Sequence, residues 1–237
     1  MLRLLSLLLA FALLGTAAAA PAAPTRGGCP VPVPRVRLPA QGPGWRIPTT
    51  WHTRGLSYGT SEMIGLIKRT AARLLRGHAG AILEVADISP RNGGASRWHR
   101  THRHGEDVDL LLFAVDAAGQ PAPAGKAMVA FDCTGKGAAT DEAGTAVPPL
   151  TFDVARNWAL VRALAEERHA KVEDILIAAC LRQKLLAHAR ATKAPRGVVA
   201  RAEKLMRQPR LSPHNNHMHV RIAATAESCV AAAPARK

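Results

Sequence analysis

Three histidines and two aspartates lie within an eleven-residue stretch, from His99 to Asp109. The histidines His99, His102 and His104 follow a glycine-rich NGG segment and are predicted to lie in a loop. Asp107 and Asp109 open the run DVDLLLF, whose apolar continuation indicates a buried strand. Side chains two residues apart share one face of a strand, so we expect both carboxylates to point the same way.

A second histidine cluster lies far down the chain, in the segment SPHNNHMHVRI. It contains His214, His217 and His219, and it also runs into a strand-like pattern. Two histidine-rich loops that each lead into a strand can bring imidazole and carboxylate groups to one point. Such mixed nitrogen and oxygen ligation suits zinc, which is catalytic when three protein ligands leave one position open.

The spacing between His102 and Asp109 suits a loop residue that curls back onto the first residues of a strand. The third ligand must then come from elsewhere, and the second cluster offers two candidates. There His217 and His219 share one face of the predicted strand, roughly 6–7 Å apart. One of them can bind the ion while its neighbour faces the substrate, and the spacing does not decide which.

The chemistry expected of such a site is hydrolysis. A zinc ion lowers the pKa of a bound water to about 7 and polarises a scissile carbonyl, and a neutral imidazole can transfer the proton. The helix motif H-E-x-x-H is absent, so a thermolysin-type site is not expected. The alternative is a weak metal-sequestering tract. Ordinary core or surface roles are expected for His52, His78, His104, His169 and His188.

The start of the chain predicts export. One basic residue, an apolar run and small residues are typical of a signal peptide, which we place at 1–20. The Pro/Ala-rich residues 21–43 predict a linker or surface strap. A single domain is expected over 44–225 and a loose tail over 226–237. No other stretch is long enough for a membrane span, so we expect a soluble exported product.

Export makes disulfides the expected state of the four cysteines, Cys29, Cys133, Cys180 and Cys229. None belongs to a C-x-x-C pair, so cysteine-bound zinc is not expected. Four cysteines allow three connectivities, and we predict Cys29–Cys229 and Cys133–Cys180. The alternative is that two or more remain buried free thiols.

The formal net charge is +15, with 32 basic against 17 acidic residues. An exported protein this basic is expected to contact an anionic surface such as cell-wall polymer, teichoic acid or lipid headgroups. Nucleic acid is not an expected partner, because the protein is exported and has few aromatic residues for base stacking. The alternative is that the excess arginine forms a solvated helix face.

The pattern of elements predicts an α+β fold with a mostly antiparallel central sheet flanked by helices. The metal site would lie between the loop that leads into the strand at 107 and the C-terminal strand. Helices are expected at 61–77 (capped by Thr60 or Ser61), 153–168, 180–191 and 197–209. Strands are expected at 81–89, 107–115, 126–133 (as a hairpin partner), 173–179 and 217–224, with a loop at 135–149.

Both histidine clusters also resemble one family. The pattern S-x2-H-x2-H-x2-G-x-D-V-D, from Ser96 to Asp109, and the pattern H-x2-H-x-H-V-R, from His214 to Arg221, are similar to signatures of the penicillin-insensitive murein endopeptidases. The helix sequence DVARNWALVRAL also looks like this family, and the likeness runs from about Gly44 to Ile222. These enzymes belong to a wider group of zinc peptidases that includes lysostaphin-type and D-Ala-D-Ala metallopeptidases.

The resemblance implies a periplasmic zinc endopeptidase that cuts D-alanyl-meso-diaminopimelyl cross-bridges of peptidoglycan. It implies His102, Asp109 and His219 as zinc ligands and His217 as base or transition-state stabiliser. It places His99 and His214 around these groups, with His99 among the metal-binding residues and His214 among the catalytic ones.

Two features depart from the family pattern. Asp153 stands where the family has the aspartate of an Asp-x-x-His metal pair, but Arg156 stands in place of the histidine. We therefore expect Asp153 to cap its helix. The cysteines also differ from the family's usual larger set.

Two other functions compete with this interpretation. A D-Ala-D-Ala carboxypeptidase or dipeptidase would use the same zinc site, but it should have a glutamate base shortly before the last ligand. None occurs between Leu205 and His219. From another class, the protein could be a non-catalytic periplasmic zinc-binding or wall-binding module.

Overall fold

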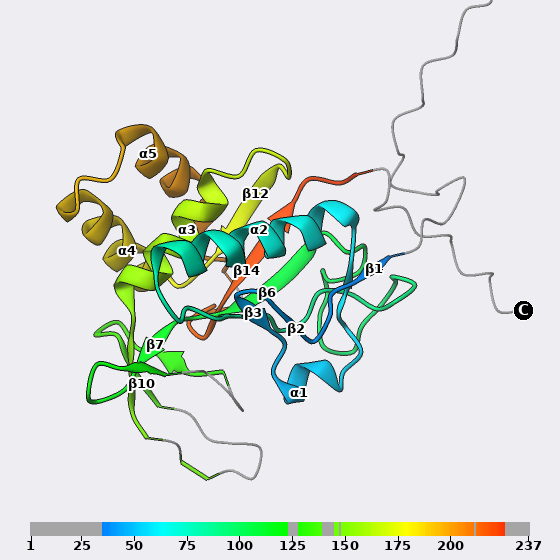
Figure 1. Cartoon of the computed structure of the whole chain (residues 1–237), viewed down its shortest axis with the longest axis horizontal. Helices are drawn as coiled ribbons and strands as arrows, with labels where there is room; N and C mark the ends of the chain where they lie inside the picture. Colours follow the sequence, from blue (N-terminus) through cyan, green and yellow to red (C-terminus); the bar gives the residue numbers. More distant parts are fainter. Residues whose placement is uncertain (1–34, 123–127, 139–144, 147, 211, 226–237) are drawn as a thin grey trace, which may run out of the picture.

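The computed structural model describes residues 35–122, 128–138, 145–146, 148–210 and 212–225 of the 237-residue chain (Figure 1). Helices and strands mix along it without a regular repeat, which confirms the α+β class. The helices of the described part are α1 (Thr49–His52), α2 (Ser61–Gly77), α3 (Val154–Ala165), α4 (Ala179–Ala191) and α5 (Arg196–Leu205).

The central sheet has the strand order β13-β12-β14-β6. Its strands are β13 (Met206–Arg207), β12 (Val172–Leu176), β14 (His217–Ile222) and β6 (Asp107–Leu111). β14 is antiparallel to both of its neighbours, whereas β13 is parallel to β12. The predicted antiparallel sheet is therefore antiparallel only in part.

Three smaller sheets surround it in the described part of the chain. One has the order β8 (Pro121–Ala122), β7 (Ala114–Val115), β11 (Leu150–Phe152), β10 (Lys136–Ala138) and β9 (Ala130–Phe131). The others are β2 (Gln41–Gly42), β3 (Trp45–Arg46) and β5 (Leu83–Glu84), and the pair β1 (Val36–Arg37) and β4 (Tyr58–Gly59). β1 and β2 fall within the predicted strap, so its last residues pair with strands of the domain.

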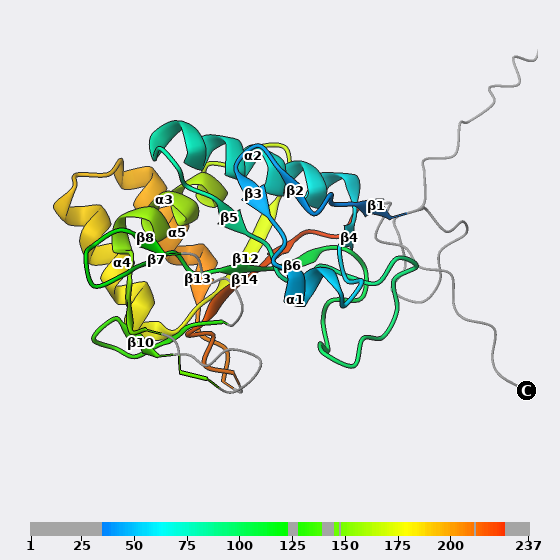
Figure 2. The ribbon, with the colours of Figure 1, turned by 60° about the horizontal axis from the view of Figure 1, so that its bottom comes forward.

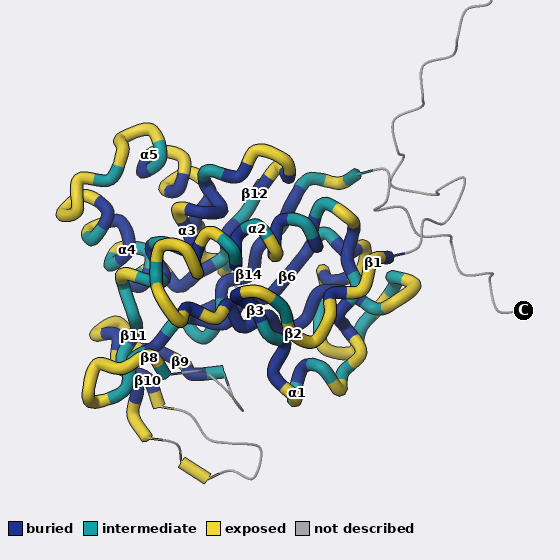
Figure 3. The backbone as a smooth tube through the Cα atoms, viewed as in Figure 1, coloured by how far each residue is buried: buried dark blue, intermediate teal, exposed yellow. Residues whose placement is uncertain are grey.

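The two faces of β6 and β14 have different roles. Val108 pairs with Val220 and Leu110 with Met218, and all four side chains are buried. Because side chains alternate along a strand, these residues form one apolar face. Helices α2 and α3 lie on one side of the sheet, and β6 and β14 run through the buried interior (Figures 2 and 3). The alternate residues are the aspartates and histidines of the two clusters.

Local sequence signals determine where helices α2 and α3 begin. The Thr60 hydroxyl accepts a hydrogen bond from the Met63 amide at 3.2 Å and caps α2. The Asp153 carboxylate accepts one from the Arg156 amide at 3.0 Å and caps α3. The predicted helix at 61–77 and the predicted capping role of Asp153 are confirmed. The buried residues of α2 recur at helical spacing and are Met63, Ile64, Leu66, Ile67, Thr70, Ala71 and Leu74.

The prediction of residues 126–133 as the hairpin partner of the strand from 107 was wrong. After β7, a turn closed by the Asp116 amide on the Gln120 carbonyl returns the chain at once as β8. Strand β9 pairs instead with β10, which lies inside the predicted loop 135–149. The turn sequence was identified, but the returning strand begins directly after it and has only two residues, too few for a residue pattern to identify.

Other boundaries shifted for similar reasons. The helix predicted to end at 209 ends at Leu205, because Met206 and Arg207 pair with β12 as β13. The strand predicted at 81–89 is reduced to β5 and an isolated bridge between Val85 and Leu110. No helix of the described residues is both long and apolar enough to cross a membrane.

A disulfide joins Cys133 to Cys180 and so ties the turn after β9 to the first turn of α4. This predicted pair is confirmed. The other predicted pair, Cys29–Cys229, lies outside the described residues.

An ion pair with a buried carboxylate connects α2 to the segment that follows α3. The Arg69 guanidinium donates to both carboxylate oxygens of Glu167, at 3.0 and 3.2 Å. The backbone amides of His169 and Ala170 donate to the same carboxylate. Burial raises the pKa of Glu167, but these hydrogen bonds and the charge of Arg69 outweigh it and lower the pKa below its ordinary value.

We expect Glu167→Gln to lower the free energy of unfolding by about 1–3 kcal/mol at neutral pH, because Arg69 loses a charged partner. Glu166→Gln is the matched control, since its side chain is 29% exposed against 5% for Glu167; its cost should be about 0.5 kcal/mol or less.

The contribution of Glu167 should also depend on pH. A depressed folded-state pKa stabilises the protein above the ordinary value of 4.5, and this stabilisation disappears as the pH falls through the lowered pKa. Urea unfolding should therefore show the difference between wild type and Glu167→Gln shrinking as the pH falls below 4.5. Equal losses for the two variants at neutral pH would contradict the prediction.

Candidate metal centre

The register between β6 and β14 places Asp109 directly opposite His219. The loop before β6 adds His102, whose side chain is buried. Three donor atoms then form a nearly equilateral triangle. His102 Nε2 and His219 Nδ1 lie 3.1 Å apart, His219 Nδ1 and Asp109 Oδ1 lie 3.1 Å apart, and His102 Nε2 and Asp109 Oδ1 lie 3.2 Å apart.

This triangle has the size that a zinc ion needs. A tetrahedral zinc with bonds of about 2.0–2.1 Å separates its ligand atoms by about 3.3 Å. One ion could contact all three atoms and keep a fourth position open. A wider grouping, with one donor atom each from His99, His102 and Asp109 all within 4.8 Å of one another, could also hold a metal. His102 and Asp109 belong to both groups, and the triangle with His219 is the tighter fit.

His102 is oriented by its outer ring nitrogen. Nδ1 donates to the Ile88 carbonyl at 2.8 Å, which leaves the Nε2 lone pair facing Asp109. The loop reaches this position through a close backbone contact at Gly105, whose φ is +78°. A Cβ at Gly105 would lie 2.9 Å from the backbone of Gly59 and Thr60, so only glycine fits here.

His219 is oriented in the same manner. Its Nε2 donates to Asp107 Oδ1 at 2.9 Å, and Arg221 holds that carboxylate with two hydrogen bonds of 2.7 and 3.0 Å. The free Nδ1 therefore faces Asp109. Metal-binding histidines commonly have their second nitrogen fixed by a carboxylate or carbonyl, and both His102 and His219 meet this condition.

The electrostatics of the centre favour a cation beside Asp109. Burial raises the pKa of its carboxyl, but the charges of His102 and His217 and hydrogen bonds from His102 and His219 hold it well below its ordinary value. Burial lowers the pKa of His219, but hydrogen bonds to Asp107 and Asp109 and their charges raise it to about 9. A buried carboxylate thus draws positive charge to the position where the three donor atoms meet.

His217 and His214 lie beside this triangle. His217 Nε2 is 3.5 Å from Asp109 Oδ1, and its Nδ1 lies 2.7 Å from Asn216 Oδ1. Burial lowers the pKa of His217 to about 4, so its imidazole is neutral at neutral pH. His214 packs against His217 with ring centroids 4.9 Å apart and has a left-handed backbone, with φ of +45°. Burial also lowers the pKa of His214.

His99 approaches Asp109 from the opposite side. Its Nδ1 lies 3.7 Å from Asp109 Oδ2, and its ring stacks on His102 with centroids 4.0 Å apart. Its Nε2 donates to Asp87 Oδ2 at 2.7 Å, and Arg54 donates to the same oxygen at 2.9 Å. His104, the remaining histidine of the first cluster, is exposed.

Sequence reasoning did not identify Asp87 as part of the site. Asp87 is buried, and its carbonyl accepts a hydrogen bond from the Asp109 amide at 3.0 Å, so the two residues are neighbours across adjacent segments. The signal was a charged residue within the apolar stretch AILEVADIS. A buried carboxylate in such a stretch needs a partner, and His99 and Arg54 supply it.

A groove of about 570 Å³ opens onto the centre. The loop from Trp98 to Thr101 lines it together with Arg207, Pro209 and Ser212. Asp109, His214, His217 and His219 also line it. The groove is large enough for several residues of a peptide beside the triangle of donor atoms.

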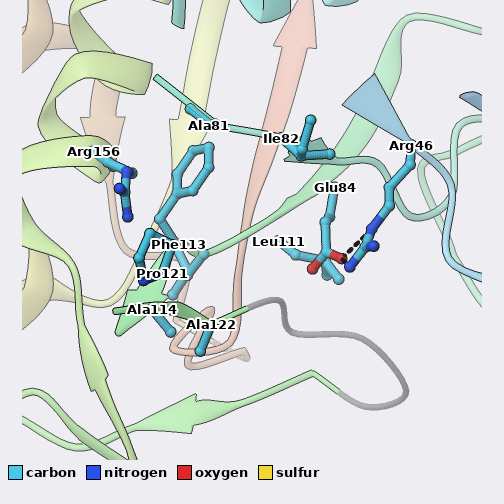
Figure 4. Close-up of a pocket in the computed structure, with 12 residues that line it drawn as sticks. Arg46, Ala81, Ile82, Glu84, Leu111, Phe113, Ala114, Pro121, Ala122 and Arg156 are labelled. Carbon is cyan, nitrogen blue, oxygen red and sulfur yellow. Dashed lines mark hydrogen bonds and ion pairs between the residues drawn. The ribbon is translucent and has the colours of Figure 1, made fainter. Parts of the chain in front are cut away.

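A second cavity, of about 190 Å³, lies apart from these groups (Figure 4). Its walls are mainly apolar, with Arg156 on one side and the Arg46–Glu84 ion pair on the other. No residue of the donor triangle lines it. Arg156 pairs with Asp153 at 3.0 Å, and neither residue lines the groove of the metal centre.

Comparison with known proteins agrees with this geometry. No curated protein sequence matches the chain. The family model described as penicillin-insensitive murein endopeptidase matches residues 25–237, which include both histidine clusters and every residue of the donor triangle. The chain belongs to the penicillin-insensitive murein endopeptidase family, a family of peptidases.

Proposed function

We propose that this protein is a zinc-dependent endopeptidase that hydrolyses D-alanyl-meso-diaminopimelyl cross-bridges of peptidoglycan. The observation that carries the proposal is the triangle of His102 Nε2, Asp109 Oδ1 and His219 Nδ1, with sides of 3.1–3.2 Å, at the base of an open groove. Membership of a murein endopeptidase family supports the substrate class. A peptidase of the cell wall acts outside the cytoplasm, and we propose the periplasm as its location.

In this proposal His102, Asp109 and His219 are the zinc ligands. Their outer partners support the assignment, because the Ile88 carbonyl and the Asp107 carboxylate hold each imidazole with its lone pair toward Asp109. His99 has a ring nitrogen facing the other oxygen of Asp109, and we propose it as a further metal-binding residue. Two imidazoles and one carboxylate form a ligand set typical of catalytic zinc.

Zinc at this position would supply Lewis acidity, which makes water nucleophilic at neutral pH and polarises the scissile carbonyl. His217 is the residue of this chain best placed to act on the reacting groups. It is neutral at pH 7, borders the groove and lies 3.5 Å from a proposed ligand atom. It can accept the proton of the attacking water or stabilise the negative charge that develops on the carbonyl oxygen.

We propose that His214 helps to position the imidazole rings of His217 and His219. Its ring packs on His217 and approaches His219, with centroids 4.9 and 5.9 Å apart, so it limits the orientations open to both. Because burial keeps its pKa low, it adds no competing positive charge. The left-handed backbone at His214 is a costly conformation for a residue with a side chain, which is typical of functional positions.

The first test is digestion of purified cross-linked muropeptide dimers. The zinc-loaded protein should convert dimers into monomers, and removal of zinc with a chelator should abolish this activity until zinc is restored. Release of free D-alanine without loss of dimers would instead identify a D-Ala-D-Ala carboxypeptidase or dipeptidase. Stoichiometric zinc with no hydrolysis of either kind would identify a non-catalytic zinc-binding or wall-binding protein.

The roles of the histidines are separated by measuring zinc content and turnover together. His217→Ala should lower kcat by about 10²–10⁴-fold while zinc content stays the same, because it removes proton transfer but no ligand. His102→Ala and His219→Ala should lose both zinc and activity. His169→Ala, at an exposed histidine outside the cluster, is the control and should keep both. Loss of zinc from His217→Ala would show that His217 is itself a ligand and would contradict its assigned role.

A further inference from the structure

The loop at residues 90–104, near the metal centre, has basic residues but no acidic ones. It contains four exposed arginines, Arg91, Arg97, Arg100 and Arg103. The same loop supplies His99 and His102 to the centre. We call these four arginines the arginine rim. The electrostatic field of these arginines therefore acts close to the candidate metal centre.

The arginine rim differs from most of the other described arginines in having no carboxylate partner among the described residues. Ten arginines elsewhere form ion pairs with Asp or Glu: Arg46, Arg54, Arg69, Arg73, Arg156, Arg162, Arg182, Arg190, Arg207 and Arg221. At those ten positions a carboxylate neutralises the guanidinium group, whereas no described carboxylate does so at the rim. Its charge remains available to a ligand.

The rim is held in place by contacts with the scaffold. The Gly94 amide donates to the Arg103 carbonyl at 2.8 Å across the loop. The Trp98 ring lies against Arg97 and Arg54, with guanidinium carbons 4.6 and 4.4 Å from its centroid. Arg54 in turn donates to buried Asp87. These contacts fix the loop backbone and the Arg97 side chain, so the loop itself loses little conformational entropy when a ligand binds.

Arg100 is the rim residue that lines the groove, between His99 and Thr101. The two carboxylates among the groove residues, Asp109 and Asp174, already have partners: Asp109 has the histidines, and Asp174 has Arg207 at 2.5 and 2.7 Å. An incoming ligand therefore meets guanidinium groups at the rim with no unpaired carboxylate to oppose them. A cleft with one sign of charge attracts ligands of the opposite sign.

From this arrangement we infer that the arginine rim binds free carboxylates of the peptide substrate, so that the enzyme selects unamidated, anionic stem peptides. The inference rests on the proposed function. In the proposed cross-bridge, the diaminopimelyl residue has a carboxyl group on the carbon that bears the scissile amide nitrogen. A guanidinium donates two parallel hydrogen bonds to a carboxylate, whereas an amidated residue offers neither the charge nor that geometry. Arg100 makes the direct contact, and Arg91, Arg97 and Arg103 contribute the attracting field.

The test compares two cross-linked dimers, one with free diaminopimelyl carboxylates and one amidated at those groups. For wild type, kcat/KM should be about tenfold higher for the free-acid dimer, mainly through KM, and salt should reduce the difference. In Arg100→Gln and in the double variant Arg97→Gln/Arg100→Gln, the ratio between the two dimers should fall toward one. Arg91→Gln/Arg103→Gln should lower it less.

The matched control is Arg196→Gln/Arg201→Gln, which removes the same charge from exposed positions of α5, distant from the loop in both views (Figures 1 and 2). It should keep the wild-type ratio. Zinc content and thermal stability, measured for every variant, separate a lost contact from a lost fold. Equal kcat/KM for the two dimers in wild type, or an equal fall of the ratio in the control, would overturn the inference and leave the proposed function standing.

Failure of the proposed function would give a different result. If the wild type cleaves neither dimer, equilibrium binding of the two dimers to the zinc-loaded protein decides the inference. Tighter binding of the free-acid dimer that is lost in Arg100→Gln would support it. Equal affinity, or displacement of neither dimer by added salt, would overturn it, as would a preference for a glycerol-phosphate polymer over both dimers.

Discussion

The candidate metal centre is organised around one buried carboxylate, that of Asp109. Its side chain is 1% exposed, and an uncompensated charge in that position would cost several kcal/mol. Imidazoles of His99, His102, His217 and His219 surround it, with ring nitrogens between 3.1 and 3.7 Å from its oxygens. The same demand for positive charge raises the pKa of His219 to about 9, and a metal ion held by His102, Asp109 and His219 would supply that charge.

Much of the surrounding fold keeps those lone pairs in position. The outer ring nitrogens of His102, His219 and His99 are taken up by Ile88, Asp107 and Asp87, so each ring is oriented by an acceptor on a neighbouring segment. Asp107 lies on β6, and Asp87 and Ile88 follow Val85, in a segment that pairs with β6. The opposite face of the same strands is apolar and packed, so the site rests on the main core of the protein.

The same loop connects the metal centre with its groove. It must bring two histidines to Asp109, and its intervening residues are mostly polar, small or basic. The stacking of Trp98 on Arg54, together with the contact between Arg54 and Asp87, joins the outside of the loop to the buried part of the site. The proposed zinc ligand His102 and the proposed substrate-binding arginine rim therefore share one structural support.

Predictions that rested on local physics agreed with the structure, whereas those that needed distant pairing agreed less well. Helix 61–77 follows from an amphipathic pattern and a threonine cap, and both are local properties. The prediction of a hairpin partner for the strand from 107 was wrong. Strands as short as β8 and β9 form where the folded sheet offers a free edge, and their own residue pattern does not reveal this. The end of α5 moved for the same reason, since β12 offers an edge to Met206 and Arg207.

The amino-acid sequence alone determined the two histidine clusters, the strand character of the residues that follow them and the pairing of both aspartates on one face. These depend on residue types and on a two-residue repeat. Tertiary structure alone decided that His219, rather than His217, lies opposite Asp109, and that Asp87 takes part. The physical reason is strand register: His217 and His219 share a face, so only the hydrogen-bonded alignment of β14 on β6 distinguishes them.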